Sequence, residues 1–140
     1  MAAREVFVDT SALYAFVNNR DAHHVRASEA VAKVATAGRW LVVTDYVIAE
    51  TVNLASVRGG EFVTRRILDL IDQSAGIRIE WIGAARFELA KAFFRKHTDH
   101  GYSFTDCTSF VVMRELRIQE VLTTDRHFTE AGFRSLLPVS

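Results

Sequence analysis

Acidic side chains follow three apolar runs of the sequence, each at the point where the run ends. Asp9 comes directly after residues 6–8 (Val-Phe-Val), an uninterrupted apolar run typical of a strand buried on both faces of a parallel sheet. Asp45 and Asp125 end two further runs, and each is preceded by a threonine. Because parallel strands end at the same edge of a sheet, acids in these places should converge where open α/β sheets bind their ligands. For Asp9 taken alone, capping of the following helix, by Asp9 or by Thr10, is an equal alternative.

Two more acids lie where a helix meets the core. Asp106 ends the run Ser-Phe-Thr-Asp that begins at Ser103, which matches a capping box with aspartate as its last member. It shares a helical face with Phe110 and Met113, so its carboxylate should lie at the rim of the core. Glu50 lies at the edge of the apolar stripe of an earlier predicted helix. Capping and chemistry are compatible roles for Asp106, and both remain open.

A group of four carboxylates needs a counter-charge. Two carboxylates ~4 Å apart repel by about 4 kcal/mol at an effective dielectric constant of about 20. No Lys or Arg is clearly placed to neutralise them, since Arg126 follows Asp125 but could equally point away. Oxygen ligands without a His or Cys cluster favour the hard cations Mg²⁺ and Mn²⁺ over zinc. Such ions pair with phosphate oxygens and assist in-line displacement at phosphorus, so this cluster indicates phosphate or phosphodiester chemistry.

Composition restricts the class of protein. With 140 residues, 49% of them hydrophobic, the chain is expected to form one globular domain that buries a substantial core. Equal numbers of basic and acidic residues, 17 of each, exclude a global field that attracts polyanions, so any nucleic-acid binding must be local. The single cysteine, Cys107, excludes an intrachain disulfide and is interpreted as a small buried residue. Without a signal peptide or a long apolar run, the protein is predicted to be cytoplasmic and to make no membrane contact.

Strands alternate with helices along the whole chain. The predicted strands cover residues 6–8, 40–43, 77–82, 121–122 and 133–139, the last of them weak, and the predicted helices cover 12–17, 25–38, 47–55, 62–76, 84–96 and 103–116. This order predicts an α/β fold, a three-layer αβα sandwich with a mostly parallel central sheet of four to five strands. The alternating pattern of 77–82 places that strand near an edge. In helix 84–96, Phe87, Ala90, Phe93 and Phe94 are predicted to face inward.

Four motifs resemble those of the PIN-domain family, specifically VapC-type toxin ribonucleases of toxin–antitoxin pairs. The motifs, in chain order, are VFVDTSAL at 6–13, VTDYVIAET at 43–51, SFTDCTSFVVM at 103–113 and LTTDRHFTEAGF at 122–133. The resemblance implies a single PIN-like nuclease domain over residues 1–140. It places the family's catalytic and metal-binding acids on Asp9, Glu50, Asp106 and Asp125, with one or two Mg²⁺ or Mn²⁺ ions.

The last motif departs from the family pattern at His127. Many relatives carry a further acid two residues after the last aspartate, so the histidine leaves a second metal site in doubt. Asp45 falls outside the matched set and is interpreted as the cap of the helix that carries Glu50. The remaining histidines show no ligand spacing and are interpreted as surface residues; they are His23, His24, His97 and His100. Three threonines that flank the acids could orient ligands or could simply cap helices and strand ends: Thr10, Thr105 and Thr124.

By resemblance, the chain is expected to hydrolyse RNA phosphodiester bonds with a metal-activated water, as the toxin of a type II pair. A cognate antitoxin protein would cover the site, promoter DNA would be bound only through that antitoxin, and a homodimer is expected. Single-stranded or loop RNA is favoured as substrate. Four arginines could guide the strand, although a solvated helix face explains them equally: Arg58, Arg65, Arg66 and Arg86.

Two other functions remain open on the sequence. A non-catalytic PIN-like domain that acts by binding is consistent with the histidine at position 127. A Mg²⁺-dependent phosphatase or phosphoacceptor that uses Asp9 is disfavoured. Such sites usually contain a catalytic lysine late in the sequence, and the last lysine of this chain is Lys96.

Overall fold

The computed structural model describes residues 4–140 and places five strands in one central sheet. The strand order is β3-β2-β1-β4-β5, and every neighbouring pair is parallel. The strands are β1 (Glu5–Val8), β2 (Trp40–Thr44), β3 (Ile77–Glu80), β4 (Glu120–Leu122) and β5 (Arg134–Ser135). The predicted parallel α/β sandwich is confirmed, and β3 lies at an edge as its alternating pattern indicated.

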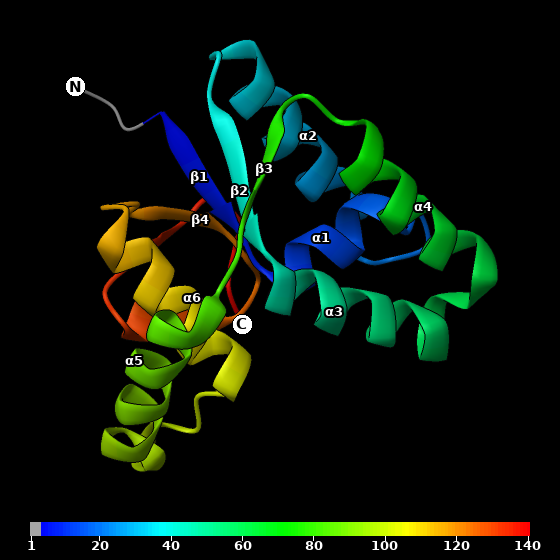
Figure 1. Cartoon of the computed structure of the whole chain (residues 1–140). Coiled ribbons are helices and arrows are strands. Elements are labelled where there is room, and N and C mark those ends of the chain that lie inside the picture. The colour runs from blue at the N-terminus through cyan, green and yellow to red at the C-terminus, as the bar shows by residue number, and fades with distance from the viewer. Residues whose placement is uncertain (1–3) are drawn as a thin grey trace.

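Helices cover both faces of the sheet (Figure 1). Helices α1, α2 and α4 lie on one side, and α5 and α6 lie on the other. The helices are α1 (Thr10–Val17), α2 (His24–Thr36), α3 (Asp45–Leu54), α4 (Gly60–Gln73), α5 (Gly83–Lys96), α6 (Phe104–Glu115) and α7 (Arg126–Glu130), with a π-helical turn η1 (Ala55–Gly59) and a 3₁₀ turn η2 (Thr98–His100). The short helix α7 was not predicted, because five residues carry too little periodicity to detect.

The order of the strands reverses at β1. The chain runs outward from β1 to β2 and β3, and then returns to place β4 on the other side of β1. The backbone amide of Asp9 donates to the carbonyl of Leu122 (3.0 Å), so β1 and β4 stay paired up to their carboxyl ends. In α/β sheets, ligands bind outside the carboxyl ends of the strands at such a switch point. Asp9 and Asp125 lie at the ends of these two strands.

Aromatic rings fill the core between the sheet and α6. Phe110 and Phe128 are fully buried and meet edge to face, with ring centroids 5.0 Å apart. Phe7, also fully buried, extends from β1 toward Phe128 at a centroid distance of 6.5 Å. Large buried rings contribute most of the core's apolar area.

Phe110→Ala is therefore expected to destabilise the protein by about 3–5 kcal/mol, through lost transfer free energy and a residual cavity. Urea denaturation at equilibrium measures the change. Phe62→Ala is the matched control, because Phe62 is 72% exposed and its loss should change stability by less than about 0.5 kcal/mol. Equal effects of the two substitutions would contradict this account of the core.

Several sequence predictions of orientation and capping were wrong. Trp81, expected to continue the inward face of β3, lies beyond the strand and is 67% exposed. Phe87 and Phe94 of α5 remain 37% and 36% exposed, because both rings pack on Phe104 at the start of α6 with no further layer above them. Asp45 does not cap α3. The Thr44 hydroxyl accepts from the amide of Val47, whereas Asp45 Oδ1 accepts from the amide of Ile82.

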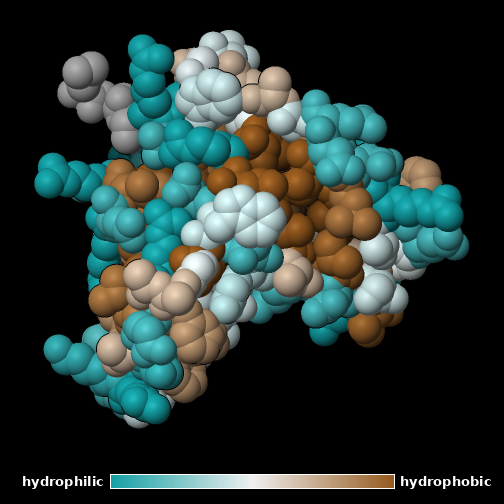
Figure 2. Space-filling view, in the orientation of Figure 1, coloured by the Kyte–Doolittle hydropathy of each residue, from teal (hydrophilic) through white to brown (hydrophobic). Residues whose placement is uncertain are grey.

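An apolar hollow lies between α2 and α4, where Figure 2 shows a continuous band of hydrophobic residues at the surface. Its volume is about 350 Å³ and its apolar lining includes Phe16, Val31, Trp40, Leu70 and Ile77. Trp40 is 43% exposed. Within residues 4–140, the helices are all too short or too polar to cross a bilayer.

Candidate metal centre

Asp9 is buried at the carboxyl end of β1 and is held by two hydroxyl groups. Its carboxylate is only 4% exposed. Oδ2 accepts hydrogen bonds from Thr123 Oγ1 (2.8 Å) and from Ser11 Oγ (3.2 Å). Although Asp9 occupies the N-cap position of α1, its side chain makes no capping hydrogen bond to that helix. Of the two roles left open for Asp9, the helix cap is therefore wrong.

Asp106 caps α6 and also faces the site. Its Oδ2 accepts from the amide of Ser103 (3.0 Å), and the Ser103 hydroxyl accepts from the amide of Asp106 (3.0 Å). This capping box confirms the sequence prediction. It fixes one carboxylate oxygen and leaves Oδ1 without a hydrogen bond from residues 4–140. Asp106 is 6% exposed, at the rim of the core as expected.

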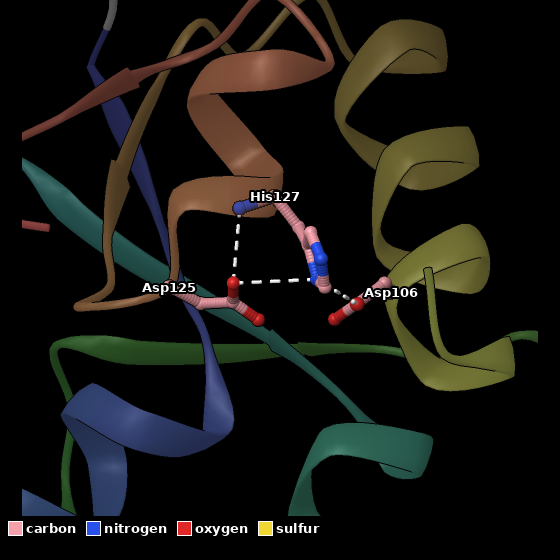
Figure 3. A group of neighbouring side chains, drawn as sticks. All are labelled: Asp106, Asp125 and His127. Atoms are coloured by element: carbon pink, nitrogen blue, oxygen red, sulfur yellow. Dashed lines mark hydrogen bonds and ion pairs between the residues drawn. The ribbon is translucent and has the colours of Figure 1, made fainter. Parts of the chain in front are cut away.

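Asp125 and His127 complete a compact group with Asp106 (Figure 3). Asp125 Oδ1 accepts from the amide of His127 (2.9 Å) and so caps α7. His127 Nδ1 lies 3.3 Å from Asp125 Oδ1 and 3.5 Å from Asp106 Oδ2. One donor atom from each of the three residues falls within 4.8 Å of the others. The three side chains come from α6, the β4–α7 connection and α7, and they point toward one another.

Burial and mutual repulsion raise the pKa of two of these acids, Asp9 and Asp106. Burial and the neighbouring Asp106 carboxylate together raise the pKa of Asp9 to about 7, against the hydrogen bonds from Thr123 and from the amide of Thr10. Burial also raises the pKa of Asp106, opposed by the amide of Ser103. Asp125 adds to the repulsion in both cases. These shifts show that Asp9, Asp106 and Asp125 act on one another through space.

This group fits a divalent cation. The carboxylates are concentrated, half of their oxygens are fixed by amides and hydroxyls, and the residues come from different elements whose positions the sheet sets. Arg126, the nearest cation in sequence, is 68% exposed and pairs with Glu130, so it does not neutralise them. A bound divalent ion would offset a repulsion of several kcal/mol.

Glu50 lies beside the compact group rather than within it. Its Oε1 accepts a hydrogen bond from Thr10 Oγ1 (2.7 Å), and Thr10 follows Asp9 in the chain. Within residues 4–140, the three-residue group that could hold an ion does not include Glu50 or Asp9. The structure therefore brings Asp106 and Asp125 together, couples Asp9 to them electrostatically, and places Glu50 next to Asp9 through Thr10.

Of the flanking threonines, only Thr10 contacts an acid. The hydroxyls of Thr105 and Thr124 form no hydrogen bond with another group in residues 4–140. Ser11 and Thr123 were missed: they bind Asp9, and Thr123 Oγ1 also accepts from the amide of Asp125 (3.0 Å). Their proximity to Asp9 and Asp125 in the motifs was the available signal.

Within residues 4–140, the other predicted polar residues form no hydrogen bond or ion pair with the four acids. Arg86 is held between Glu80 and Glu115, so it is part of an ion-pair network rather than a solvated face. Arg58 lines a hollow of about 550 Å³ together with Arg20 and Phe62. His24 and His97 are half-buried and contact backbone carbonyls, which corrects their assignment to the surface. Burial raises the pKa of the Cys107 thiol to about 11, which agrees with a filler role.

Comparisons with known proteins place the chain in a family. The family model described as "PIN domain" matches residues 6–134. The 23S rRNA-specific endonuclease VapC20 of Mycobacterium tuberculosis is 33% identical over 133 residues, 95% of this chain and 98% of the relative. Ribonuclease VapC26 of the same species is 32% identical over 126 residues, 89% and 90% of the two chains.

A solved structure shares the fold as well. The crystal structure of Mycobacterium tuberculosis VapC20, described as a Sarcin-Ricin loop cleaving toxin, superposes with a TM-score of 0.83 at 32% identity. The match covers 91% of this chain and 95% of that one. The parallel sheet, the acids at its carboxyl edge and these matches along nearly the whole chain lead to one assignment: the chain belongs to the PIN-domain family, among the VapC-type proteins.

Proposed function

We propose that this chain is a single-domain, Mg²⁺- or Mn²⁺-dependent endoribonuclease and the toxin of a type II toxin–antitoxin pair. The observation that carries the proposal is the convergence of Asp9, Asp106 and Asp125 at the switch point of the sheet. Relatives named as ribonucleases support the activity. Asp9, Glu50, Asp106 and Asp125 are proposed as the residues that carry it.

Each residue has a separate task in this proposal. A divalent ion, when bound, supplies positive charge for the phosphate and for the water that attacks it. Asp106 and Asp125 would hold the ion, together with Asp9, which lies outside their compact group but is coupled to it electrostatically. Thr123 and Ser11 fix the orientation of the Asp9 carboxylate. Glu50, oriented by Thr10, lies outside the ligand group and is placed to accept the proton that the attacking water loses. The water oxygen forms a new bond to phosphorus, one P–O bond of the RNA backbone breaks, and the departing oxygen takes a proton from solvent. No covalent link to the protein forms.

The test is cleavage of RNA by purified protein with Mg²⁺ or Mn²⁺, and its loss on addition of EDTA. Mapping of the new 5′ and 3′ ends distinguishes internal cleavage from trimming. Asp106→Asn should abolish cleavage while the protein stays folded by circular dichroism. RNA that stays intact with every divalent ion, in protein that binds RNA, would instead support the non-catalytic alternative.

A loop of a structured RNA is the proposed substrate. Its flexible backbone can bend into a recessed acidic site, whereas an A-form helix cannot. Ribosomal RNA is the first substrate to test, because the relative VapC20 is named for it. Arg20 and Arg58, in the hollow next to the exposed ring of Phe62, offer charge and a stacking surface for flanking nucleotides.

The proposed partner is an antitoxin protein that covers the site and binds promoter DNA. The exposed apolar hollow between α2 and α4 supports a protein partner, because monomeric proteins seldom leave such surfaces open. A homodimer and a cytoplasmic location are part of the same proposal. Toxicity on expression, relieved by co-expression of a small neighbouring gene, tests the pairing directly.

Thr10→Val is expected to lower the rate of RNA cleavage by about tenfold, since it frees the Glu50 carboxylate. Single-turnover kinetics with saturating metal measure the change. Thr105→Val is the matched control and should leave the rate within about twofold. The Thr105 hydroxyl forms no hydrogen bond with any of the four acids within residues 4–140. Equal losses in both variants would contradict the assigned role of Thr10.

A further inference from the structure

His127 presents a buried nitrogen that makes no hydrogen bond. Of the side-chain nitrogen and oxygen atoms in residues 4–140, only His127 Nδ1 and Ser109 Oγ are buried without such a partner. The His127 side chain is 24% exposed, so the exposed part of the ring is not Nδ1. A buried polar atom without a partner costs about 1–3 kcal/mol. Such an atom beside carboxylates calls for a ligand.

Nδ1 lies at ion-pair distance from two carboxylates but forms a hydrogen bond with neither. It is 3.3 Å from Asp125 Oδ1 and 3.5 Å from Asp106 Oδ2 (Figure 3), yet it meets hydrogen-bond geometry with neither oxygen. Ligands at ~2.1 Å from one ion lie roughly 3 Å apart when they are adjacent in an octahedron. The observed separations are close to that spacing, so one ion can contact all three groups after small adjustments.

The surroundings fix the imidazole ring in this position. Tyr102 packs edge to face against it at a centroid distance of 5.4 Å. Gly101 lies near the other ring nitrogen: a Cβ atom added to Gly101 would be 3.9 Å from His127 Nε2. The amide of His127 is bound by Asp125, which ties the backbone to the same carboxylate that faces the ring. The nitrogen is therefore preorganised rather than free to rotate away.

From this geometry we infer that His127 is a nitrogen ligand of the metal centre and makes the centre prefer Mn²⁺ over Mg²⁺. The inference rests on the proposed metal-dependent function and specifies its cofactor. Mn²⁺ and Mg²⁺ both bind carboxylates, but Mn²⁺, as a transition-metal ion, accepts an imidazole nitrogen more readily than Mg²⁺, which prefers oxygen ligands and keeps its waters. The histidine at this position is thus a change of donor from oxygen to nitrogen rather than the loss of a ligand.

Pulsed electron paramagnetic resonance of the Mn²⁺-loaded protein tests the inference without any measurement of activity. Wild-type protein should show ¹⁴N coupling of a directly bound imidazole, and His127→Asp and His127→Asn should lose it. Calorimetry should show that His127→Asp lowers the ratio of Mn²⁺ to Mg²⁺ affinity by about tenfold or more. His100→Asn is the matched control: it removes another histidine near Tyr102 and should retain both the coupling and the ratio.

The outcomes separate this inference from the proposed function. Mn²⁺ binding without ¹⁴N coupling, or with coupling that persists in His127→Asn, would overturn the inference and leave the nuclease proposal intact. No binding of either ion by wild-type protein would overturn both.

Discussion

Asp9→Asn is expected to reduce metal-dependent RNA cleavage by about a thousandfold and at the same time to stabilise the metal-free protein at pH 8. The loss of activity follows from removing a charged ligand, whose contribution to the transition state is several kcal/mol. The gain in stability follows from the cost of ionising a carboxyl group that is 4% exposed and faces other acids. Asparagine keeps an oxygen to accept from Thr123 and Ser11 but carries no charge.

The size of the stabilisation has an upper limit. Burial raises the pKa of Asp9 from 3.8 to about 7, and each pKa unit corresponds to about 1.4 kcal/mol, so the charge costs at most about 4 kcal/mol above pH 7. Urea denaturation in EDTA at pH 8 measures the gain. Asp45→Asn is the control, since Asp45 also ends a strand but binds the amide of Ile82 away from the cluster. An Asp9→Asn protein that still cleaves RNA, or that is less stable than wild type at pH 8, would contradict the proposed role of Asp9.

The acids could be predicted because their positions follow from topology alone. An apolar run that ends in aspartate fixes the carboxylate at the edge of a parallel sheet, whatever the details of packing. Asp9 and Asp125 were found in this way, whereas Asp106 was found from its capping box and its helical face. The relation of Glu50 to them depends on a hydrogen bond from Thr10 across 40 residues of sequence, which no local pattern contains.

Contacts across the sheet were harder to predict than the elements themselves. Thr123 contacts both Asp9 and Ser11 because β1 and β4 are neighbours, a pairing that joins residues more than 110 positions apart. His127 was interpreted only as a missing acid, since its proximity to Asp106 depends on how α7 packs beside α6.

The predicted burial of side chains was wrong where the apolar face of a helix or strand is wider than the part that neighbouring elements cover. The aromatic residues of α5 illustrate this: Ala90 is buried, whereas Phe87 keeps 37% of its surface exposed. Periodicity identifies the apolar face of an element, but the amount of that face that is covered depends on the size of the layer above it.

The stability of the metal-free protein should fall as the pH rises from about 4 to about 7. The folded state binds more protons than the unfolded chain in this window, because the pKa of Asp9 is raised to about 7 from 3.8. The free energy of unfolding therefore decreases with pH by at most about 4 kcal/mol from this group, and the raised pKa of Asp106 acts in the same direction. Burial would raise the pKa of Glu120, but hydrogen bonds from Arg134 and Arg39 lower it. Glu120 therefore makes stability increase with pH, but only at pH values below its unfolded pKa near 4.5.

A divalent ion should weaken this dependence. At pH 8 the ion meets ionised carboxylates and should stabilise the protein by about 2.7 kcal/mol at a concentration of 100 times its Kd. At pH 5 a proton on Asp9 competes with the ion, so the same concentration should stabilise less. Unfolding midpoints at pH 5, 6, 7 and 8, with EDTA and with Mn²⁺, measure both effects. Asp9→Asn should flatten the metal-free profile, since the group whose proton is lost in this window is absent. A wild-type profile that rises steadily to pH 8 in EDTA would contradict the raised pKa of Asp9 and the electrostatic cost that a bound ion is expected to offset.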